Sequence, residues 1–177
     1  MGFKIAVGVI TALVIFLGFV ASRPADYTIS REITINASAE KIFPFLDSTK
    51  LADTWGPWRE VDPQIKMSYS GPETGVGSKA SWVSPGQMGT GSATIVDVTP
   101  NSKVGIQLEY IKPMNMIQYA EYIVRSENGA SVVTWRVQGK NSFIGRLMCM
   151  FINMDAHVGS MFDKGLNNLK VLVERQG

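Results

Sequence analysis

The sequence has one cysteine and one histidine among its 177 residues. A single cysteine, Cys149, excludes an intramolecular disulfide and any multi-cysteine metal site. Its neighbours in the run MCMF are apolar, so we expect a buried thiol that packs like a small apolar residue. The histidine, His157, has no carboxylate on its own helical face, because Asp155 lies two residues away. We therefore expect a boundary histidine rather than a metal ligand or a catalytic base.

The sequence also has no large excess of positive or negative charge. The chain has 17 Lys and Arg against 15 Asp and Glu, and removing Lys4 and Arg23 of the first 23 residues leaves 15 of each (17 − 2 = 15). A neutral body without a basic cluster argues against nucleic acid as a partner. The Gly-x-Ser-x-Gly elbow of serine hydrolases is absent from the sequence as well, and no residue pattern indicates a covalent nucleophile.

One glycine-rich stretch, GVGSKA at residues 75–80, fits the letters of a dinucleotide-binding loop. Such a loop must follow a strand and open a helix, whereas residues 78–83 alternate as a strand does. We therefore expect neither a nucleotide nor another cofactor.

The chain does contain one long apolar run. Residues 5–21 are uncharged and reach roughly 26 Å as a helix, close to the roughly 30 Å thickness of a bilayer core. The small residues around Ala21 would also suit a signal peptidase, which leaves a cleaved signal peptide as the alternative. We predict a single-pass membrane anchor over residues 1–23 and one domain over residues 24–177. A short N-terminus usually stays inside, so we expect this domain on the extracytoplasmic side.

The body reads as one α+β domain. Residues 27–36 alternate as a half-buried strand, and Ser38 then starts short helical pieces that Pro44 interrupts. Alternating runs joined by turns follow and predict an antiparallel meander. The expected strands of this meander are 65–69, 78–83, 93–98, 104–110, 115–125 and 131–138.

In the last third of the chain the spacing of the apolar residues changes. From Ser142 to Arg175, apolar residues recur every three or four positions, which predicts one long amphipathic helix. Glycine weakens a helix by up to about 1 kcal/mol relative to alanine. We therefore expect close packing or a slight bend at Gly145, Gly159 and Gly165.

Several local strings accompany this order of elements: REITINASAEKIF at 31–43, WGPW at 55–58 followed by DP at 62–63, GVG at 75–77 followed by Trp82, TW at 134–135 and GLNNLK at 165–170. Together they resemble the SRPBCC superfamily (START-like, or birch-pollen-allergen-like), and within it the polyketide cyclase/dehydrase and lipid-transport group, over about residues 27–175. Some members have a short hydrophobic N-terminus, which favours the anchor over the cleaved signal.

The resemblance implies a helix-grip fold. In this fold a curved antiparallel sheet of six to seven strands wraps on a long C-terminal helix, with two short helices after the first strand. It also implies a hydrophobic cavity between sheet and helix for lipids, sterols, polyketides or similar ligands.

The expected ligand-binding residues are apolar and come from every part of the domain. Trp55 and Trp58, separated by a turn at Gly56-Pro57, could lie at the cavity mouth or could simply plug the end of the core. The other expected lining residues are Met67, Trp82, Tyr110, Tyr119 and Trp135 on the strands, and Met154, Val158 and Met161 on the helix.

Two ionisable residues fall in register with apolar strand positions. Glu121 alternates with Tyr119 and is the candidate general base, because burial can raise a carboxylate pKa. Arg31 alternates with Ile29 and Ile33 and is a candidate polar anchor inside the cavity. Both residues could instead lie in water at a strand end.

The sequence favours a membrane-tethered protein that binds a hydrophobic small molecule or lipid between the sheet and the terminal helix. One alternative is a cyclase/dehydrase-like or hydrolase-like enzyme that uses the same cavity. Another is a non-catalytic interaction module. The expected partners are the small molecule or lipid and, through the N-terminal helix, a membrane; the oligomeric state stays open.

Overall fold

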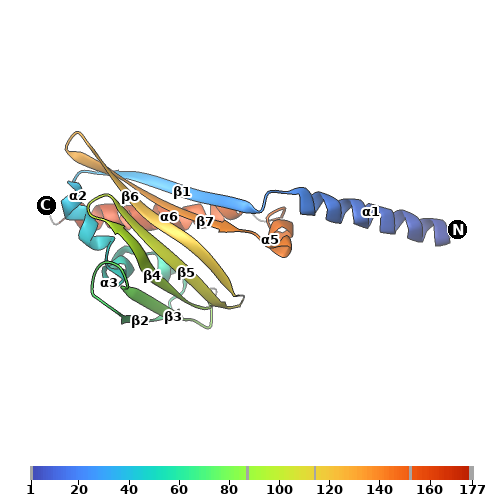
Figure 1. The fold of residues 1–177 in the computed structure, drawn as a ribbon, viewed down its shortest axis with the longest axis horizontal. Helices are drawn as coiled ribbons and strands as arrows, with labels where there is room; N and C mark the ends of the chain where they lie inside the picture. The colour runs from blue at the N-terminus through green and yellow to red at the C-terminus, as the bar shows by residue number, and fades with distance from the viewer. Residues whose placement is uncertain (1, 87, 114, 152, 176–177) are drawn as a thin grey trace.

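A curved sheet grips a long helix, and a second long helix leaves the domain at one end (Figure 1). The structure is a computed structural model that describes residues 2–86, 88–113, 115–151 and 153–175. The gripped helix is α6 (Met154–Glu174), and the helix that extends away is α1 (Gly2–Ser22). Figure 1 shows α5 (Phe143–Met148) beside the end of α1, with α2 (Ala39–Ile42) and α3 (Thr49–Trp55) at the opposite end of the domain.

The sheet has seven antiparallel strands in the order β1-β7-β6-β5-β4-β3-β2. This order confirms the predicted meander and adds β1 beside β7, where Asp26 pairs with Lys140 and Ile35 with Ser131. The strands are β1 (Asp26–Ile35), β2 (Lys66–Ser70), β3 (Lys79–Val83), β4 (Thr90–Thr99), β5 (Lys103–Lys112), β6 (Met116–Glu127) and β7 (Ala130–Lys140).

Short helices follow β1, as predicted. Helix α2 runs into a 3-10 turn, η1 (Phe43–Phe45), at Pro44, whose ring disfavours a continuing α-helix. Helix α3 begins at the N-cap Ser48, whose side chain accepts a hydrogen bond from the backbone N–H of Leu51. After the turn at Gly56-Pro57, α4 (Trp58–Val61) follows. Helices α2 to α4 close one end of the space between the sheet and α6.

The prediction of one helix from Ser142 to Arg175 is wrong in its first third. The segment forms α5, a break, and then α6. Asn153 is the N-cap of α6 and accepts a hydrogen bond of 3.0 Å from the backbone N–H of Ala156, a role that asparagine favours. Helix α5 packs against α1 instead of extending α6.

Two helical glycines mark close packing, as expected. A Cβ atom at Gly165 would lie 2.8 Å from the Trp135 ring and 3.2 Å from Pro57. A Cβ atom at Gly159 would overlap the guanidinium of Arg31, which crosses α6 at that point. Each glycine therefore lets α6 approach groups on the sheet side that any larger residue would push away.

Helix α1 is apolar enough to cross a membrane. Its residues Lys4–Ser22 form 19 residues with a mean hydropathy of 2.6. By length and composition this helix could serve as a membrane anchor or as a signal sequence. Among its described side chains only Val20, near the end that meets the domain, is buried.

Candidate ligand-binding site

The middle of the space between the sheet and α6 is filled by aromatic rings. Trp135 of β7 stacks on Phe162 of α6, with ring centroids 4.2 Å apart and an interplanar angle of 10°. It also forms edge-to-face pairs with Trp55, Trp58 and Tyr122, with ring centroids 5.5, 5.6 and 5.4 Å away and interplanar angles of 81°, 82° and 67°. Such edge-to-face and stacked pairs stabilise a core beyond their buried area.

The two tryptophans of the WGPW string, Trp55 and Trp58, belong to this cluster. Trp55 is 1% exposed, and its indole Nε1–H donates a hydrogen bond of 2.9 Å to the Phe45 carbonyl. Trp58 is half-buried against the same core. Together with Trp135, these residues occupy the core-plugging arrangement that the sequence left as the alternative to a cavity mouth.

Three further expected lining residues lie together near the other edge of the sheet. Met67 and Trp82 are cross-strand partners, and the Trp82 ring meets Tyr110 edge-on at 5.7 Å. The indole N–H of Trp82 donates to the Met88 carbonyl at 3.0 Å. Burial raises the pKa of Tyr110 to about 12. On α6, Val158 and Met161 are half-buried, whereas Met154 is exposed.

Tyr119 and Glu121 lie on the outer face of the sheet. The expectation that Tyr119 lines a cavity is therefore wrong, and Glu121 takes the alternative position outside it. Their neighbours Ala120 and Tyr122 are buried toward α6, and successive side chains of a strand point to opposite faces. Glu121 is therefore outside the space between sheet and helix. Its carboxylate pairs with Arg136 at 2.5 Å, which also explains its partial burial.

The concave face of the sheet is closed at one end and open at the other. Toward the α2–α4 end its side chains are fully buried, as at Val124 and Ile35. Toward the α1 end the same strands carry half-buried residues, Gln118 on β6 and Tyr27 on β1. The core therefore ends before the sheet does, and concave surface is left uncovered near α1.

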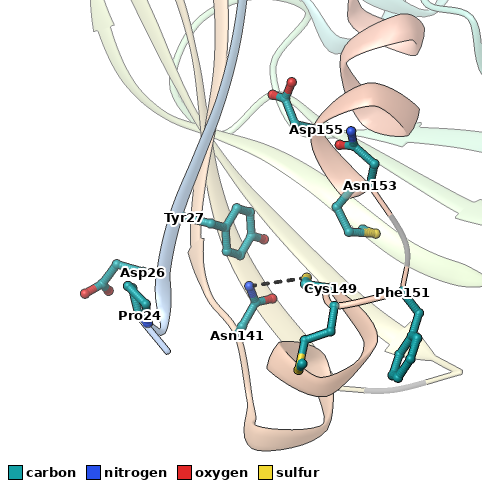
Figure 2. Close-up of a pocket in the computed structure, with 10 residues that line it drawn as sticks. Pro24, Asp26, Tyr27, Asn141, Cys149, Phe151, Asn153 and Asp155 are labelled. Atoms are coloured by element: carbon teal, nitrogen blue, oxygen red, sulfur yellow. Dashed lines mark hydrogen bonds between the residues drawn. The ribbon is translucent and has the colours of Figure 1, made fainter. Parts of the chain in front are cut away.

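An open pocket of about 550 Å³ lies at this uncovered end. Figure 2 shows the Tyr27 ring pointing into it from β1, opposite the segment between α5 and α6, while Asp26 points away. The pocket is lined by Pro24, Asp26, Tyr27, Asn141, Cys149, Met150, Phe151, Asn153, Met154 and Asp155. Of the ligand-binding residues expected from the sequence, Met154 alone belongs to this set.

Tyr27 is fixed by polar contacts on the sheet side. The Gln118 amide donates a hydrogen bond to its hydroxyl. Burial raises the pKa of Tyr27, and this hydrogen bond opposes part of the rise, so the phenol is neutral at physiological pH. Across the pocket, the Asn141 amide donates to the Cys149 Sγ at 3.8 Å. Cys149 is exposed, which corrects the expectation of a buried thiol.

Arg31 points toward α6, as its register predicted, and ties the pocket edge to the helix. Its Nη2 donates to the Asp155 carboxylate and to the Asp155 carbonyl, both at 3.0 Å. Its Nε lies 3.4 Å from the Asp163 carboxylate. The hydrogen bond from Arg31 lowers the pKa of Asp155 below its ordinary value of 3.8. The Asp155 negative charge in the pocket is thus balanced by the adjacent guanidinium.

A second, smaller pocket of about 320 Å³ adjoins the first and reaches the end of α1. Both pockets share Pro24, Asn141, Cys149 and Met150, and the second adds Arg23 and Arg146. Arg146 Nη1 donates to the carbonyls of Ala21 at 2.7 Å and Arg23 at 3.1 Å. This arginine satisfies carbonyls at the C-terminal end of α1, where a cation is favourable.

The sequence did not point to most of the pocket. Tyr27, Asn141 and Cys149 come from a strand start, a strand end and the break after α5. The one usable signal was Asn153, a good N-cap residue inside a pattern that otherwise reads as helix. His157 is exposed on α6 outside the pocket lining. Among the described residues, no group of three His, Cys, Asp or Glu side chains is placed to hold a metal ion.

Comparison with known proteins places this fold in a family. Residues 26–174 match the family described as polyketide cyclase/dehydrase and lipid transport. A structure from Mesorhizobium loti aligns with a TM-score of 0.62 at 13% identity, covering 85% of this chain and 99% of that one. The Aha1 dimer from Colwellia psychrerythraea aligns with a TM-score of 0.59 at 20% identity, covering 84% of this chain and 96% of that one.

The di-domain ARO/CYC StfQ from the steffimycin biosynthetic pathway aligns with a TM-score of 0.63 at 9% identity, covering 86% of this chain and 52% of that one. At such identities the likeness shows the fold alone. Among curated proteins, none matches the sequence. The family match spans most of the chain and coincides with the seven-stranded sheet and α6 of a helix-grip fold. The chain therefore belongs to the polyketide cyclase/dehydrase and lipid transport family of the SRPBCC superfamily.

Proposed function

We propose that the protein is a membrane-tethered binding protein for a hydrophobic small molecule or lipid, held in the pocket at the α1 end of the concave face. The observation that carries the proposal is the 550 Å³ pocket itself, which opens where the aromatic core ends. Binding sites for small molecules commonly span about 300–1,000 Å³. The site differs from the sequence-based expectation because rings of the core occupy the middle of the grip.

The lining supports an amphiphilic ligand. Met150, Phe151 and the Tyr27 ring offer apolar surface, and burial of such surface contributes roughly 25 cal/mol per Å² before ordering costs. Asn141 and Asn153 offer amide groups, which can both donate and accept hydrogen bonds. This combination suits a molecule with an apolar body and an uncharged polar head.

The tether supports a lipid or lipid-like source for the ligand. Pro24 and Arg23, directly after α1, line the two adjoining pockets. If α1 spans a bilayer, the pocket lies close to its surface. A hydrophobic molecule could then reach the pocket from the membrane with little exposure to water.

The catalytic alternative needs a different base from the one the sequence suggested. Glu121 lies on the outer face and is paired with Arg136. The pocket lining has two carboxylates, and Asp26 points away from the pocket (Figure 2). The other, Asp155, has its pKa lowered by Arg31, whereas a general base at neutral pH needs a raised carboxylate pKa. The observations on the site therefore favour binding over turnover.

Ligand retention tests the proposal directly. The full chain, purified in detergent, would be stripped of lipid, incubated with a total lipid extract and analysed by native mass spectrometry. We expect retained masses of one class of amphiphile. Empty protein after incubation with several extracts would overturn the proposed function.

A pocket-filling variant sharpens this test. Met150→Trp puts an indole into the space shared by both pockets and is expected to reduce ligand retention severalfold. Ile117→Trp is the matched control, because Ile117 is exposed on the outer face of β6. Equal retention by the two variants would place the ligand elsewhere on the molecule.

A further inference from the structure

We propose that α5 and the start of α6 rest on the surface of a lipid bilayer beside α1, so that the pocket opens toward lipid. This inference depends on the membrane tether of the proposed function and adds a second, separate contact with the bilayer. The contact, here called the α5 surface, consists of the exposed apolar side chains of Phe143, Ile144, Met148, Phe151 and Met154.

Helix α5 is attached to the end of α1 by specific contacts. Arg146 donates hydrogen bonds to the carbonyls of Ala21 and Arg23, and its guanidinium lies over the Phe143 ring at 5.8 Å from the centroid. Val20 is fully buried where α1 meets the domain. The α5 surface is therefore held beside the point at which α1 would emerge from a bilayer.

The apolar side chains of the α5 surface are gathered in one short segment and are strongly exposed. Ile144 is 62% exposed and Phe151 is 77% exposed. All five apolar side chains fall within residues 143–154, next to an apolar helix whose described side chains, apart from Val20, are exposed. Continuity with α1 identifies lipid as the occupant, because a surface fixed beside a membrane helix meets the interface first.

Charge on the same segment complements anionic headgroups. From Asn141 to Met154 the sequence has no acidic residue and one basic residue, Arg146. The carboxylate of Asp155, which follows, is paired with Arg31. Arg23 lies beside Arg146 in the lining of the smaller pocket. Basic side chains at the membrane surface, flanking buried apolar ones, are typical of interfacial helices.

This placement gives the pocket a direct path to the bilayer. Phe151 and Met154 belong both to the α5 surface and to the pocket lining. A bilayer that covers the α5 surface therefore touches the pocket rim. The ligand class that follows is a membrane-resident amphiphile that enters from the lipid side.

The lone cysteine provides a probe for this geometry without any mutation. Cys149 is exposed and lies in the segment between α5 and α6. The full chain would be reconstituted in vesicles of phosphatidylcholine with a minor fraction of phosphatidylglycerol, and Cys149 labelled with a nitroxide. Its collision rates with oxygen, which concentrates in lipid, and with a water-soluble nickel chelate report the depth of the label.

The reference position lies at the opposite end of the domain. Glu127→Cys, made together with Cys149→Ser, places the same label at the turn between β6 and β7 (Figure 1). We expect the oxygen-to-nickel ratio at Cys149 to exceed that at the reference position severalfold.

Two matched variants test the α5 surface itself. Ile144→Glu adds a charge to that surface, and Ile117→Glu adds the same charge at a similarly exposed isoleucine on the outer face of β6. We expect Ile144→Glu to raise the nickel accessibility of the Cys149 label severalfold and Ile117→Glu to leave it unchanged.

Failure of this inference is distinguishable from failure of the proposed function. One outcome is a chain that resists alkaline extraction from the vesicles but whose labels at the two positions have the same low oxygen-to-nickel ratio, as in water. This outcome would overturn the α5 contact and leave the tether intact. Chain that is extracted would overturn both the tether and the contact, while ligand retention in detergent still tests the pocket. Protection of Cys149 that rises with protein density rather than with lipid would assign the surface to a second copy.

Discussion

The two ends of the concave face differ in what covers them. From the middle toward the α2–α4 end, Trp135 stacks on Phe162 and packs edge-to-face against other buried rings, Trp55 and Tyr122. At the α1 end the same sheet carries Tyr27 and polar partners beside an open pocket. The same strands thus build a rigid core over one half of their length and a recess over the other.

This division separates the residues that hold the fold together from those that would meet a ligand. The aromatic cluster can keep its packing while the pocket residues vary, because few side chains belong to both. Pockets built beside, rather than within, a packed core can change their lining at little expense in stability.

The largest expected effect follows from removing the centre of the closed end. Trp135→Ala deletes the stack on Phe162 and three edge-to-face contacts, and we expect a loss of about 3–5 kcal/mol in the free energy of unfolding. Urea unfolding of the full chain in detergent, followed by circular dichroism, measures it. Met150→Ala at the open end should lose less than about 1 kcal/mol. Similar losses for both variants would contradict the division into two ends.

The next largest difference is in the stability effects of alanine substitutions at two glycines of α6. At Gly165 an added methyl meets the rigid Trp135 ring and Pro57, and overpacking costs about 1–3 kcal/mol. At Gly159 the methyl meets the end of the flexible Arg31 side chain, which can move away. Because alanine improves helix propensity by up to about 1 kcal/mol, we expect Gly165→Ala to destabilise and Gly159→Ala to be near neutral. Thermal unfolding that ranks them in reverse would show that α6 is more tightly constrained at Gly159 than at Gly165.

The smallest expected effect is the pH dependence of the stability that the ion pair at the pocket edge contributes. The pKa of Asp155 is lowered in the folded protein by the hydrogen bond from Arg31, so this ion pair stabilises the fold above the unfolded pKa of the carboxyl group. The contribution is lost as the pH falls through the folded pKa, below 3.8. Wild type should exceed Asp155→Asn in stability at neutral pH and converge with it at acid pH. A difference that is the same at both extremes would assign the effect of the variant to something other than ionisation.

Most of the fold could be predicted because its signals are local. Alternating runs separated by glycine and asparagine turns marked the strands of the meander, and Pro44 marked the end of α2. The pairing of β1 with β7 joins distant parts of the chain, and no local pattern in the sequence indicates it.

The facing of β6 could not be read from its pattern. Apolar residues occupy both parities of this strand, with Ile117 and Tyr119 on one side and Ala120 and Tyr122 on the other. The alternation of a strand shows which face is buried only where every second residue is polar. Glu121 faces outward because its neighbour Tyr122 packs inward against Trp55 and Trp135. The sequence does not display these contacts.

The pocket was missed because three separate chain segments form it. The start of β1, the end of β7 and the break between α5 and α6 meet only after the sheet has closed on α6. Helical periodicity runs through residues 142–175 and hides that break. A single cap residue, Asn153, outweighs the pattern locally because α5 packs on α1 instead.

Photo-cross-linking shows most directly where a ligand lies. A monoacylglycerol analogue, whose head is uncharged, would carry a diazirine near the middle of its acyl chain. It would be incubated with the full chain in vesicles and irradiated, and the adducts would be located by peptide mass spectrometry. We expect adducts on the segment from Cys149 to Asp155 and on Tyr27, and their loss in Met150→Trp. Adducts confined to the outer face, around Tyr119, would contradict a ligand site at the open end of the grip.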